Sequence, residues 1–286
     1  MTINLTIINP FGVWQGSDHR LTDPNTRLVV DDYSIKHVII RCPDGAALLA
    51  YAGIGKVKNL DISDWIRETL RGENRTLDQS FILIRENSTR DLGQLLYKHS
   101  IPHMYSIGAF LNGQPWCIQI RNFNSKAGVP DGSILNHFIT AAKPIENSGQ
   151  SFIFGDGEKA IPKKDRTTFF EMASRKPRQP KEFRDLLATI IRRSAKNMTG
   201  EKSISSSCVI TYMPPTGEPF ESKFYGGDKT HKPLITPMLL FGIDLTELQR
   251  GTIGNIHSKD STKSTKEKSF DDFAENSVSP KNRLRQ

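Results

Sequence analysis

The chain has 286 residues, with 39 Lys or Arg against 31 Asp or Glu, so its formal net charge is +8 at pH 7. This length can bury a full core, and 36% hydrophobic residues is compatible with a soluble globular protein. The chain has no apolar run long enough to cross a bilayer and no charged start followed by an apolar core, so we expect a cytoplasmic protein without a membrane partner.

The first residues predict a β-hairpin. Apolar and polar residues alternate over 3–7, which is typical of a strand with one buried face. Residues 9–12, Asn-Pro-Phe-Gly, suit a type I turn, and residues 13–21 return as the partner strand. This hairpin would bring Asp18 and Arg20 close to the start of the chain.

The residue at that start is Thr2 once Met1 is removed, and a small second residue favours removal. A chain-terminal threonine can act as a nucleophile, because its own α-amino group, with a pKa of about 7.7–8.0, serves as the base. The alternative is an ordinary N-terminal strand that happens to begin with threonine.

Strands and helices then follow in alternating groups. Strands are expected at 35–42 and 46–52, joined by a Pro-Asp-Gly turn, and the second strand ends at Gly53. A helix begins at Asp61 or Ser63 and ends at Gly72. A longer helix runs from the capping box at Thr76 to about His99, with a polar interruption at 86–91, and a hairpin at 103–123 turns at Asn112-Gly113.

In the second half of the chain, groups of strands again alternate with a pair of helices. We expect a surface loop at 124–134, short strands at 138–142 and 151–154, helices at about 163–175 and 181–196, a hairpin at 205–224, and a closing hydrophobic segment at 237–248. Ser- and Lys-rich composition from residue 251 onward predicts a disordered polar tail. The chain is therefore divided into one domain, 1–250, and a tail, 251–286.

The order of the elements predicts the fold class. Hairpin-joined strands and paired helices exclude a parallel βαβ fold. The solution that buries every apolar face stacks two antiparallel sheets and places one helix pair outside each. We therefore expect an α+β protein, a four-layer α-β-β-α sandwich.

Cysteine spacing and the distribution of charge say less about function. The three cysteines, Cys42, Cys117 and Cys208, form no C-x-x-C pair, so we expect buried thiols, no metal and no cofactor. Residues 158–202 hold 13 Lys or Arg against six Asp or Glu. Nucleic-acid binding is conceivable there, but the stretch lacks interleaved surface aromatics, and a solvated helix face is favoured.

The order of the elements resembles that of the N-terminal-nucleophile (Ntn) hydrolases, and within them the proteasome β-subunit and HslV type. The resemblance covers roughly residues 2–213. In that family the mature chain begins with the catalytic threonine, which Thr2 matches. The family's second strand carries a G-x-x-x-A-x-D-x-R-x-T-like motif, which residues 12–22, GVWQGSDHRLT, resemble. Asp18 and Arg20 fall at the family's spacing from the nucleophile without a gap.

The resemblance implies roles for further residues. The family's basic pair on the next strand corresponds to Lys36-His37. An ungapped match puts His37 in the place of the catalytic lysine, whereas a slip of one residue puts Lys36 there. Gly53 would supply the N–H of the oxyanion hole, and Ser17 and Arg20 would support the site.

Two features depart from the family pattern. The family's Gly-Ser-Gly before the third helix, whose serine helps to order the terminal amine, is Gly155-Asp156-Gly157 here, so Asp156 would have to hold the ammonium group. The family's late Asp has no clear match, although Ser205 lies in the serine-rich turn that follows it. An inactive member of the family would show such changes too.

The resemblance implies an N-terminal-threonine peptidase or amidase that acts on a peptide or amide substrate and forms a homo-oligomeric ring. The alternative is a catalytically inactive scaffold subunit of the same fold. The sequence has no G-x-x-x-x-G-K-[ST] motif, so ATP-driven delivery of substrate would need a separate unfoldase.

Overall fold

The structure is a computed structural model that describes residues 2–22, 28–57, 60–126, 129–146, 149–198, 204–226 and 235–246. The predicted tail, 251–286, lies outside the described residues, and the division into domain and tail stays a prediction. No helix in the described ranges is long and apolar enough to span a membrane.

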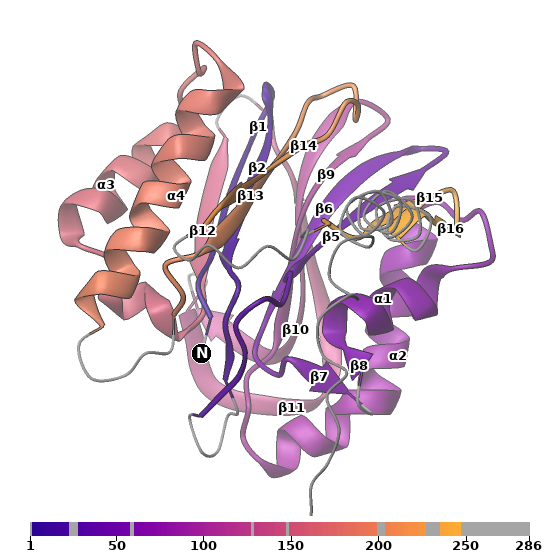
Figure 1. The fold of residues 1–286 in the computed structure, drawn as a ribbon. Helices are drawn as coiled ribbons and strands as arrows, with labels where there is room; N and C mark the ends of the chain where they lie inside the picture. Colours follow the sequence, from indigo (N-terminus) through magenta and orange to yellow (C-terminus); the bar gives the residue numbers. More distant parts are fainter. Residues whose placement is uncertain are drawn as a thin grey trace, which may run out of the picture. The chain divides into compact units, whose positions relative to one another are not determined.

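Two large sheets form the centre of the molecule (Figure 1). The five-stranded sheet has the order β12-β1-β2-β13-β14, and its strands are β1 (Asn4–Asn9), β2 (Gly12–Asp18), β12 (Gln150–Phe154), β13 (Cys208–Met213) and β14 (Glu221–Tyr225). The seven-stranded sheet has the order β11-β10-β9-β6-β5-β15-β16, and its strands are β5 (His37–Cys42), β6 (Gly45–Ala52), β9 (Met104–Leu111), β10 (Gln114–Lys126), β11 (Val129–Pro144), β15 (Met238–Leu240) and β16 (Ile243–Asp244). Two small ribbons pair β3 (Leu21–Thr22) with β4 (Val29–Asp31) and β7 (Lys56–Val57) with β8 (Leu60–Asp61).

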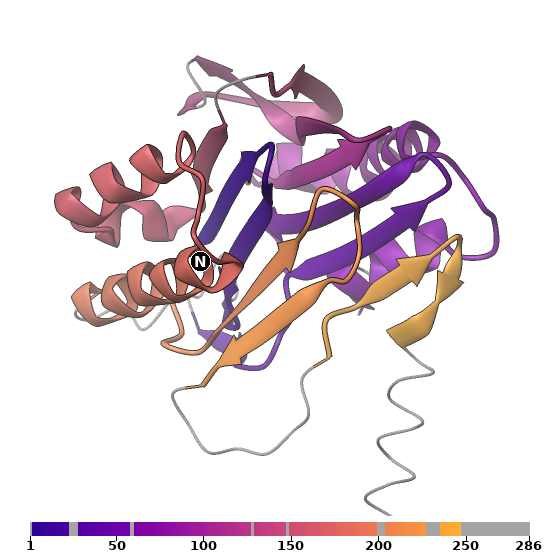
Figure 2. The ribbon, with the colours of Figure 1, turned by 90° about the horizontal axis from the view of Figure 1, so that it is seen from above.

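Helices cover the outer faces of both sheets (Figures 1 and 2). The helices α3 (Lys163–Met172) and α4 (Pro180–Asn197) pack on the five-stranded sheet, where Trp14 contacts Phe183. The helices α1 (Ile62–Leu70) and α2 (Leu77–Lys98) pack on the seven-stranded sheet. A third cluster, which includes Ile8, Val13 and Phe110, fills the space between the sheets. The predicted mixed α+β class is confirmed.

Local sequence explains where several elements begin and turn. The predicted first hairpin is present, and Asn9 Oδ1 accepts a hydrogen bond from Phe11 N at 2.9 Å in its turn. Asn112 and Gly113 both have positive φ, as a tight two-residue hairpin requires. The capping box at the start of α2 is formed, with Thr76 and Gln79 exchanging side-chain and backbone hydrogen bonds.

Two sequence-based expectations were wrong. Among the described strand pairs of the two sheets, β5 and β15 are parallel, so the sheets are not wholly antiparallel. Of the region predicted as a loop at 124–134, the described residues 124–126 and 129–134 belong to the long β10–β11 ribbon, because register shifts near Phe123 let pairing continue past its turn-type residues. Helix α2 agrees with the prediction: it continues through the polar stretch 86–91, where Ser88 is buried and donates to Tyr105 Oη at 3.0 Å.

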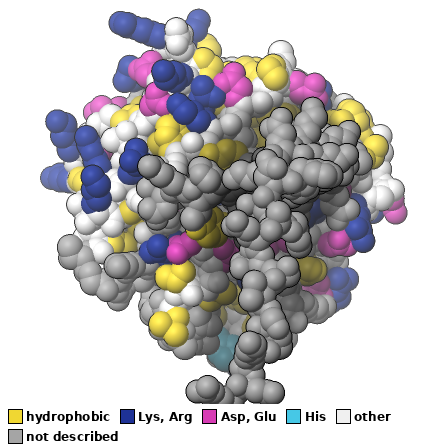
Figure 3. All heavy atoms as spheres, viewed as in Figure 1, with side chains coloured by type: hydrophobic (Ala, Val, Ile, Leu, Met, Phe, Trp, Pro, Cys, Tyr) yellow, Lys and Arg dark blue, Asp and Glu magenta, His cyan; other side chains and the backbone are white. Residues whose placement is uncertain are grey.

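The cysteines are the buried thiols that the sequence predicts, and the basic stretch forms ion pairs on the surface of α3 and α4. Cys42, Cys117 and Cys208 are buried and form no disulfide. Figure 3 shows Lys and Arg side chains gathered over the α3 and α4 side of the molecule, with acidic side chains among them. Three of the described ion pairs there join Arg166 to Glu158, Arg175 to Glu182 and Arg193 to Asp165.

Candidate active site

A turn from the second half of the chain holds the start of the first strand. Thr2 precedes β1 and is only 6% exposed, and its carbonyl accepts a hydrogen bond from Gly157 N at 3.3 Å. Gly155 has φ 112°, and a Cβ added to it would lie 2.0 Å from Thr2 O. Only glycine fits this approach without moving the chain, so the 155–157 turn fixes the position of Thr2.

Asp18, the last residue of β2, accepts hydrogen bonds from four different residues of the chain. It is fully buried. Its Oδ1 accepts from Ile3 N at 3.1 Å and from Lys36 Nζ at 2.9 Å. Its Oδ2 accepts from Arg20 N at 3.1 Å and from Ser205 N at 3.2 Å. Four N–H donors are therefore directed at one buried carboxylate beside the start of the chain, and one of them, Lys36 Nζ, forms an ion pair with it.

Lys36 immediately precedes β5, and its Nζ contacts Thr2. The amine donates to Thr2 Oγ1 at 2.8 Å, to Asp18 Oδ1 at 2.9 Å and to Arg20 O at 2.6 Å. These three acceptors match the three N–H bonds of an ammonium group. Burial lowers the pKa of Lys36 from its usual value, and the charge of Asp18 opposes this shift. Such an amine can polarise the threonine hydroxyl.

Two buried histidines, His19 and His37, flank residues of this cluster in the sequence, and within the described part of the chain no hydrogen bond joins either of them to Thr2. His37 is fully buried, neither of its ring nitrogens has a hydrogen-bond partner among the described residues, and burial lowers its pKa to about 3. Of the two registers left open by the sequence, the structure places Lys36 against Thr2. His19, which the sequence analysis did not single out, is also buried, and burial lowers its pKa to about 4.

Two of the residues predicted to support the site, Arg20 and Ser205, contact Asp18 or Lys36 through backbone atoms. Arg20 contacts Asp18 and Lys36 through its backbone N and O, while its guanidinium pairs with Asp32. Ser205 donates its N–H to Asp18 and accepts at Oγ from Ser207 N at 3.0 Å. Ser17 is buried, and its Oγ has no partner within the described part of the chain.

Gly53 and Asp156 are less closely connected to the cluster. Gly53 follows β6 with φ 121°, and the end of β6 is tied to β1 because Asn4 Nδ2 donates to Tyr51 O at 2.7 Å. In the ranges that the structure describes, no hydrogen bond joins Gly53 to Thr2. Asp156 begins the 3-10 helix η1 (Asp156–Ala160), and its side chain lies outside the described part. The described ranges contain no group of three or more His, Cys, Asp or Glu that could hold a metal ion.

Comparison with known proteins places this geometry in a known fold. No family model matches the chain, and no curated protein matches it. The structure of the helical assembly of the Anbu complex from Pseudomonas aeruginosa aligns with a TM-score of 0.54 at 12% identity, over 91% of this chain and 96% of that one. The chain shares the fold of the Anbu proteins. Anbu from Yersinia bercovieri, described as the ancestral β-subunit, aligns with a TM-score of 0.53 at 15% identity, over 80% of this chain and 88% of that one.

This finding corrects the type that the sequence suggested. The assignment to the proteasome β-subunit and HslV type was wrong, because the similar structures are Anbu proteins, which are proteasome-like but distinct from HslV. The spacing of Asp18 and Arg20 after Thr2 reflects the geometry of a hairpin, and a hairpin does not distinguish one type from another.

Gly155→Ala is expected to lower the free energy of unfolding by about 3 kcal/mol. The left-handed backbone costs about 1–2 kcal/mol for a residue with a Cβ, and displacing the Thr2 carbonyl adds about 1–3 kcal/mol. The matched control is Gly72→Ala, where φ is 94° but an added Cβ meets nothing within 4 Å. Urea unfolding measures both variants, and equal losses would contradict a role for Gly155 in fixing Thr2.

Proposed function

We propose that the chain is an N-terminal-threonine hydrolase that cleaves peptide or amide bonds with Thr2 after removal of Met1. The observation that carries this proposal is the contact of 2.8 Å between Lys36 Nζ and Thr2 Oγ1, made by a lysine that is also paired with the buried Asp18. The proposal includes the four-layer α-β-β-α order that is typical of the Ntn-hydrolase fold.

The proposed mechanism assigns each proton to a group. Thr2 Oγ1 attacks the carbonyl carbon of the substrate while the α-amine of Thr2 takes the hydroxyl proton. The Lys36 ammonium stabilises the negative charge that develops on Oγ1, and Asp18 keeps Lys36 protonated despite its burial. The amine then gives its proton to the leaving nitrogen, and water hydrolyses the ester formed on Thr2.

The other residues have supporting roles in this proposal. The N–H of Gly53 would stabilise the oxyanion, and Asp156 would hold the terminal ammonium group in place of the serine of the related enzymes. Ser205 and Arg20 would orient Asp18 through their backbone N–H groups, which lie 3.2 and 3.1 Å from Oδ2. Ser17 has a buried hydroxyl one residue before Asp18 and would help to hold this end of β2 in position.

An inactive scaffold subunit is the second candidate function. Thr2 is only 6% exposed, and Asp156 stands where the related enzymes have serine, and both features favour a site that does not turn over substrate. In either case we propose that the chain self-associates, on the precedent of the helical assembly of the Anbu complex from Pseudomonas aeruginosa. A ring and a separate ATP-driven unfoldase remain parts of this proposal.

The test uses an epoxyketone that condenses with both the hydroxyl and the amine of a terminal threonine. We expect one adduct, located on Thr2 by peptide mass mapping. The adduct should be absent in Thr2→Ala and present in Thr2→Ser, which keeps a hydroxyl beside the amine. The intact mass shows whether Met1 has been removed. If Met1 is removed and no adduct forms, the hydrolase proposal is wrong and the scaffold remains.

A further inference from the structure

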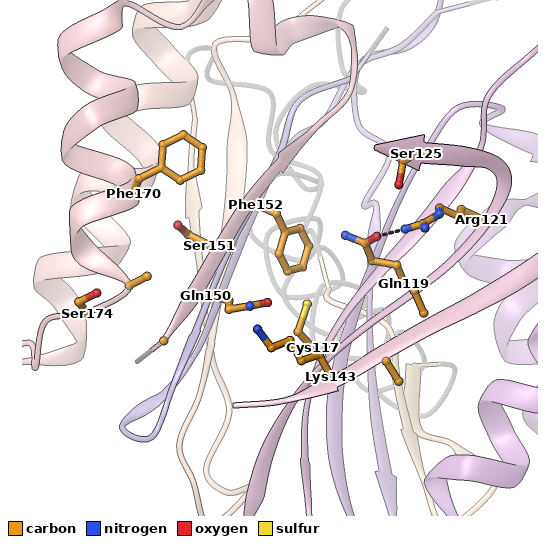
Figure 4. Close-up of a pocket in the computed structure, with 14 residues that line it drawn as sticks. Cys117, Gln119, Arg121, Ser125, Lys143, Gln150, Ser151, Phe152, Phe170 and Ser174 are labelled. Carbon is orange, nitrogen blue, oxygen red and sulfur yellow. Dashed lines mark hydrogen bonds between the residues drawn. The ribbon is translucent and has the colours of Figure 1, made fainter. Parts of the chain in front are cut away.

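A cleft of about 600 Å³ lies where the edge of the five-stranded sheet faces the β10–β11 ribbon (Figure 4). Strand β12 and the end of α3 form one side of it, and β10 and β11 form the other. The volume is within the range of about 300–1,000 Å³ that is usual for ligand sites. The cleft is separate from Thr2, because its β12 residues pair with Thr6 to Ile8 of β1, at least four residues along the strand.

The charge of the cleft is positive and uncompensated. Arg121 and Lys143 line it, and none of its described lining residues is Asp or Glu. Lys143 has no ion-pair partner among the described residues. Arg121 donates only to neutral acceptors there, Gln119 Oε1 and, at 3.2 Å, Phe123 O. Two cations that face one cleft without a carboxylate favour an anionic ligand.

The cleft also runs along a free strand edge. Within the described part of the chain, β12 pairs with β1 alone and ends its sheet. Gln150, Ser151 and Phe152 all line the cleft, although consecutive residues of a strand point to opposite faces. Figure 4 shows Phe152 directed toward Gln119 and Cys117, with Ser151 on the side of Phe170. The cleft therefore follows the backbone edge of β12, where N–H and C=O groups can pair with another strand.

We propose that this cleft binds an extended acidic peptide segment, which adds to β12 as a further strand. Alternate side chains of the peptide would point toward Lys143 and Arg121, which selects Asp or Glu at those positions. The side chains between them would point toward Phe170, which is 46% exposed and selects apolar residues. Backbone hydrogen bonds to β12 would supply affinity that does not depend on sequence.

The spacing of the two cations favours a peptide over a single small anion. On the β10–β11 ladder Lys143 pairs with Cys117, four residues from Arg121 on the same strand. Four residues of antiparallel strand span about 14 Å along the backbone, so the two cationic side chains project from well-separated positions on the wall of the cleft. Residues i and i+4 of an extended peptide are separated by the same distance, so two acidic side chains four residues apart can reach both cations.

The test measures the binding of a fluorescent Glu-Val-Glu-Phe-Glu-Val-Glu peptide, acetylated and amidated at its ends, by anisotropy with the full chain. We expect Lys143→Gln and Arg121→Gln each to weaken binding about tenfold, because each removes a charge-assisted contact. Lys164→Gln removes the same charge from the exposed face of α3, outside the cleft, and should change binding little. Equal weakening by all three variants would overturn the proposal, and so would no binding at low salt.

Two N-methylated peptides test whether the ligand adds as a strand. One carries methyl groups on every second amide and the other on the alternate set, so only one of them blocks the amides that face β12. We expect that peptide alone to lose binding, and the unmodified peptide to slow hydrogen exchange in β12. Equal binding of both peptides, or competition by glutarate as effective as that by the peptide, would overturn strand addition. Thr2→Ala should bind equally, which separates this result from the proposed hydrolase.

Discussion

Asp18→Asn is expected to lower the free energy of unfolding by about 3–5 kcal/mol. The variant leaves Lys36 Nζ buried without its counter-charge, and an unpaired buried charge is costly. The new amide also places N–H groups against the N–H groups of Arg20 and Ser205, or against that of Ile3. Urea unfolding at neutral pH measures the loss.

A double-mutant cycle separates the ion pair from the packing around it. Lys36→Met keeps the length of the side chain and removes its charge, so it should also destabilise the chain by leaving Asp18 unpaired. The double variant should lose less than the sum of the two single variants, because no charge remains uncompensated. Glu86→Gln, which removes one half of the exposed pair with Arg85, is the control and should change stability little. Additive losses for Asp18→Asn and Lys36→Met would contradict the coupling.

Local patterns were sufficient to predict the elements that depend on nearby residues. The hairpin at Asn112-Gly113 and the capping box at Thr76 each depend on residues within one turn, and both are present. The placement of Asp18 near Thr2 follows from the same locality, because a tight turn fixes the register of β1 against β2. An antiparallel return brings the end of β2 to the beginning of β1.

Contacts between distant segments were not predictable in the same way. Whether Lys36 or His37 faces Thr2 depends on where β5 begins, and a shift of one residue turns a strand's side chains to the opposite face. The parallel pairing of β15 with β5 joins segments from opposite halves of the chain, and no turn between them sets its direction. The cleft beside β12 likewise combines β10, β11, β12 and α3, and no sequence motif spans these elements.

Acidification from pH 7 to pH 5 is expected to remove about 6 kcal/mol of stability, through three buried histidines. Burial lowers the pKa of His19 to about 4, and that of His37 and His103 to about 3. The unfolded chain binds these protons near pH 6.5, whereas the folded chain does not. Between these values the unfolded state holds more protons, so stability is lost as the pH falls from about 6.5 toward about 4 and 3.

The size of the loss follows from the same difference in proton binding. At pH 5 each of the three histidines is mostly protonated in the unfolded chain, which favours unfolding by about 2 kcal/mol per residue. Carboxylates with ordinary pKa values near 4 change their charge mainly below pH 5, so they contribute little in this interval. A small domain has about 5–15 kcal/mol of total stability, so the chain should be close to unfolding at pH 5.

His37→Leu tests how much of the pH dependence of stability comes from one buried histidine, without breaking a hydrogen bond of its side chain. The ring nitrogens of His37 have no hydrogen-bond partner among the described residues, and leucine has a similar volume. The variant should lose about 2 kcal/mol less than the parent chain between pH 7 and pH 5, measured by urea unfolding at both values. His137→Gln changes an exposed histidine and should leave the pH dependence as it is. If His37→Leu keeps the full pH dependence, the unfolded and folded chains bind the same number of protons at His37, and its burial does not make the protein sensitive to acid.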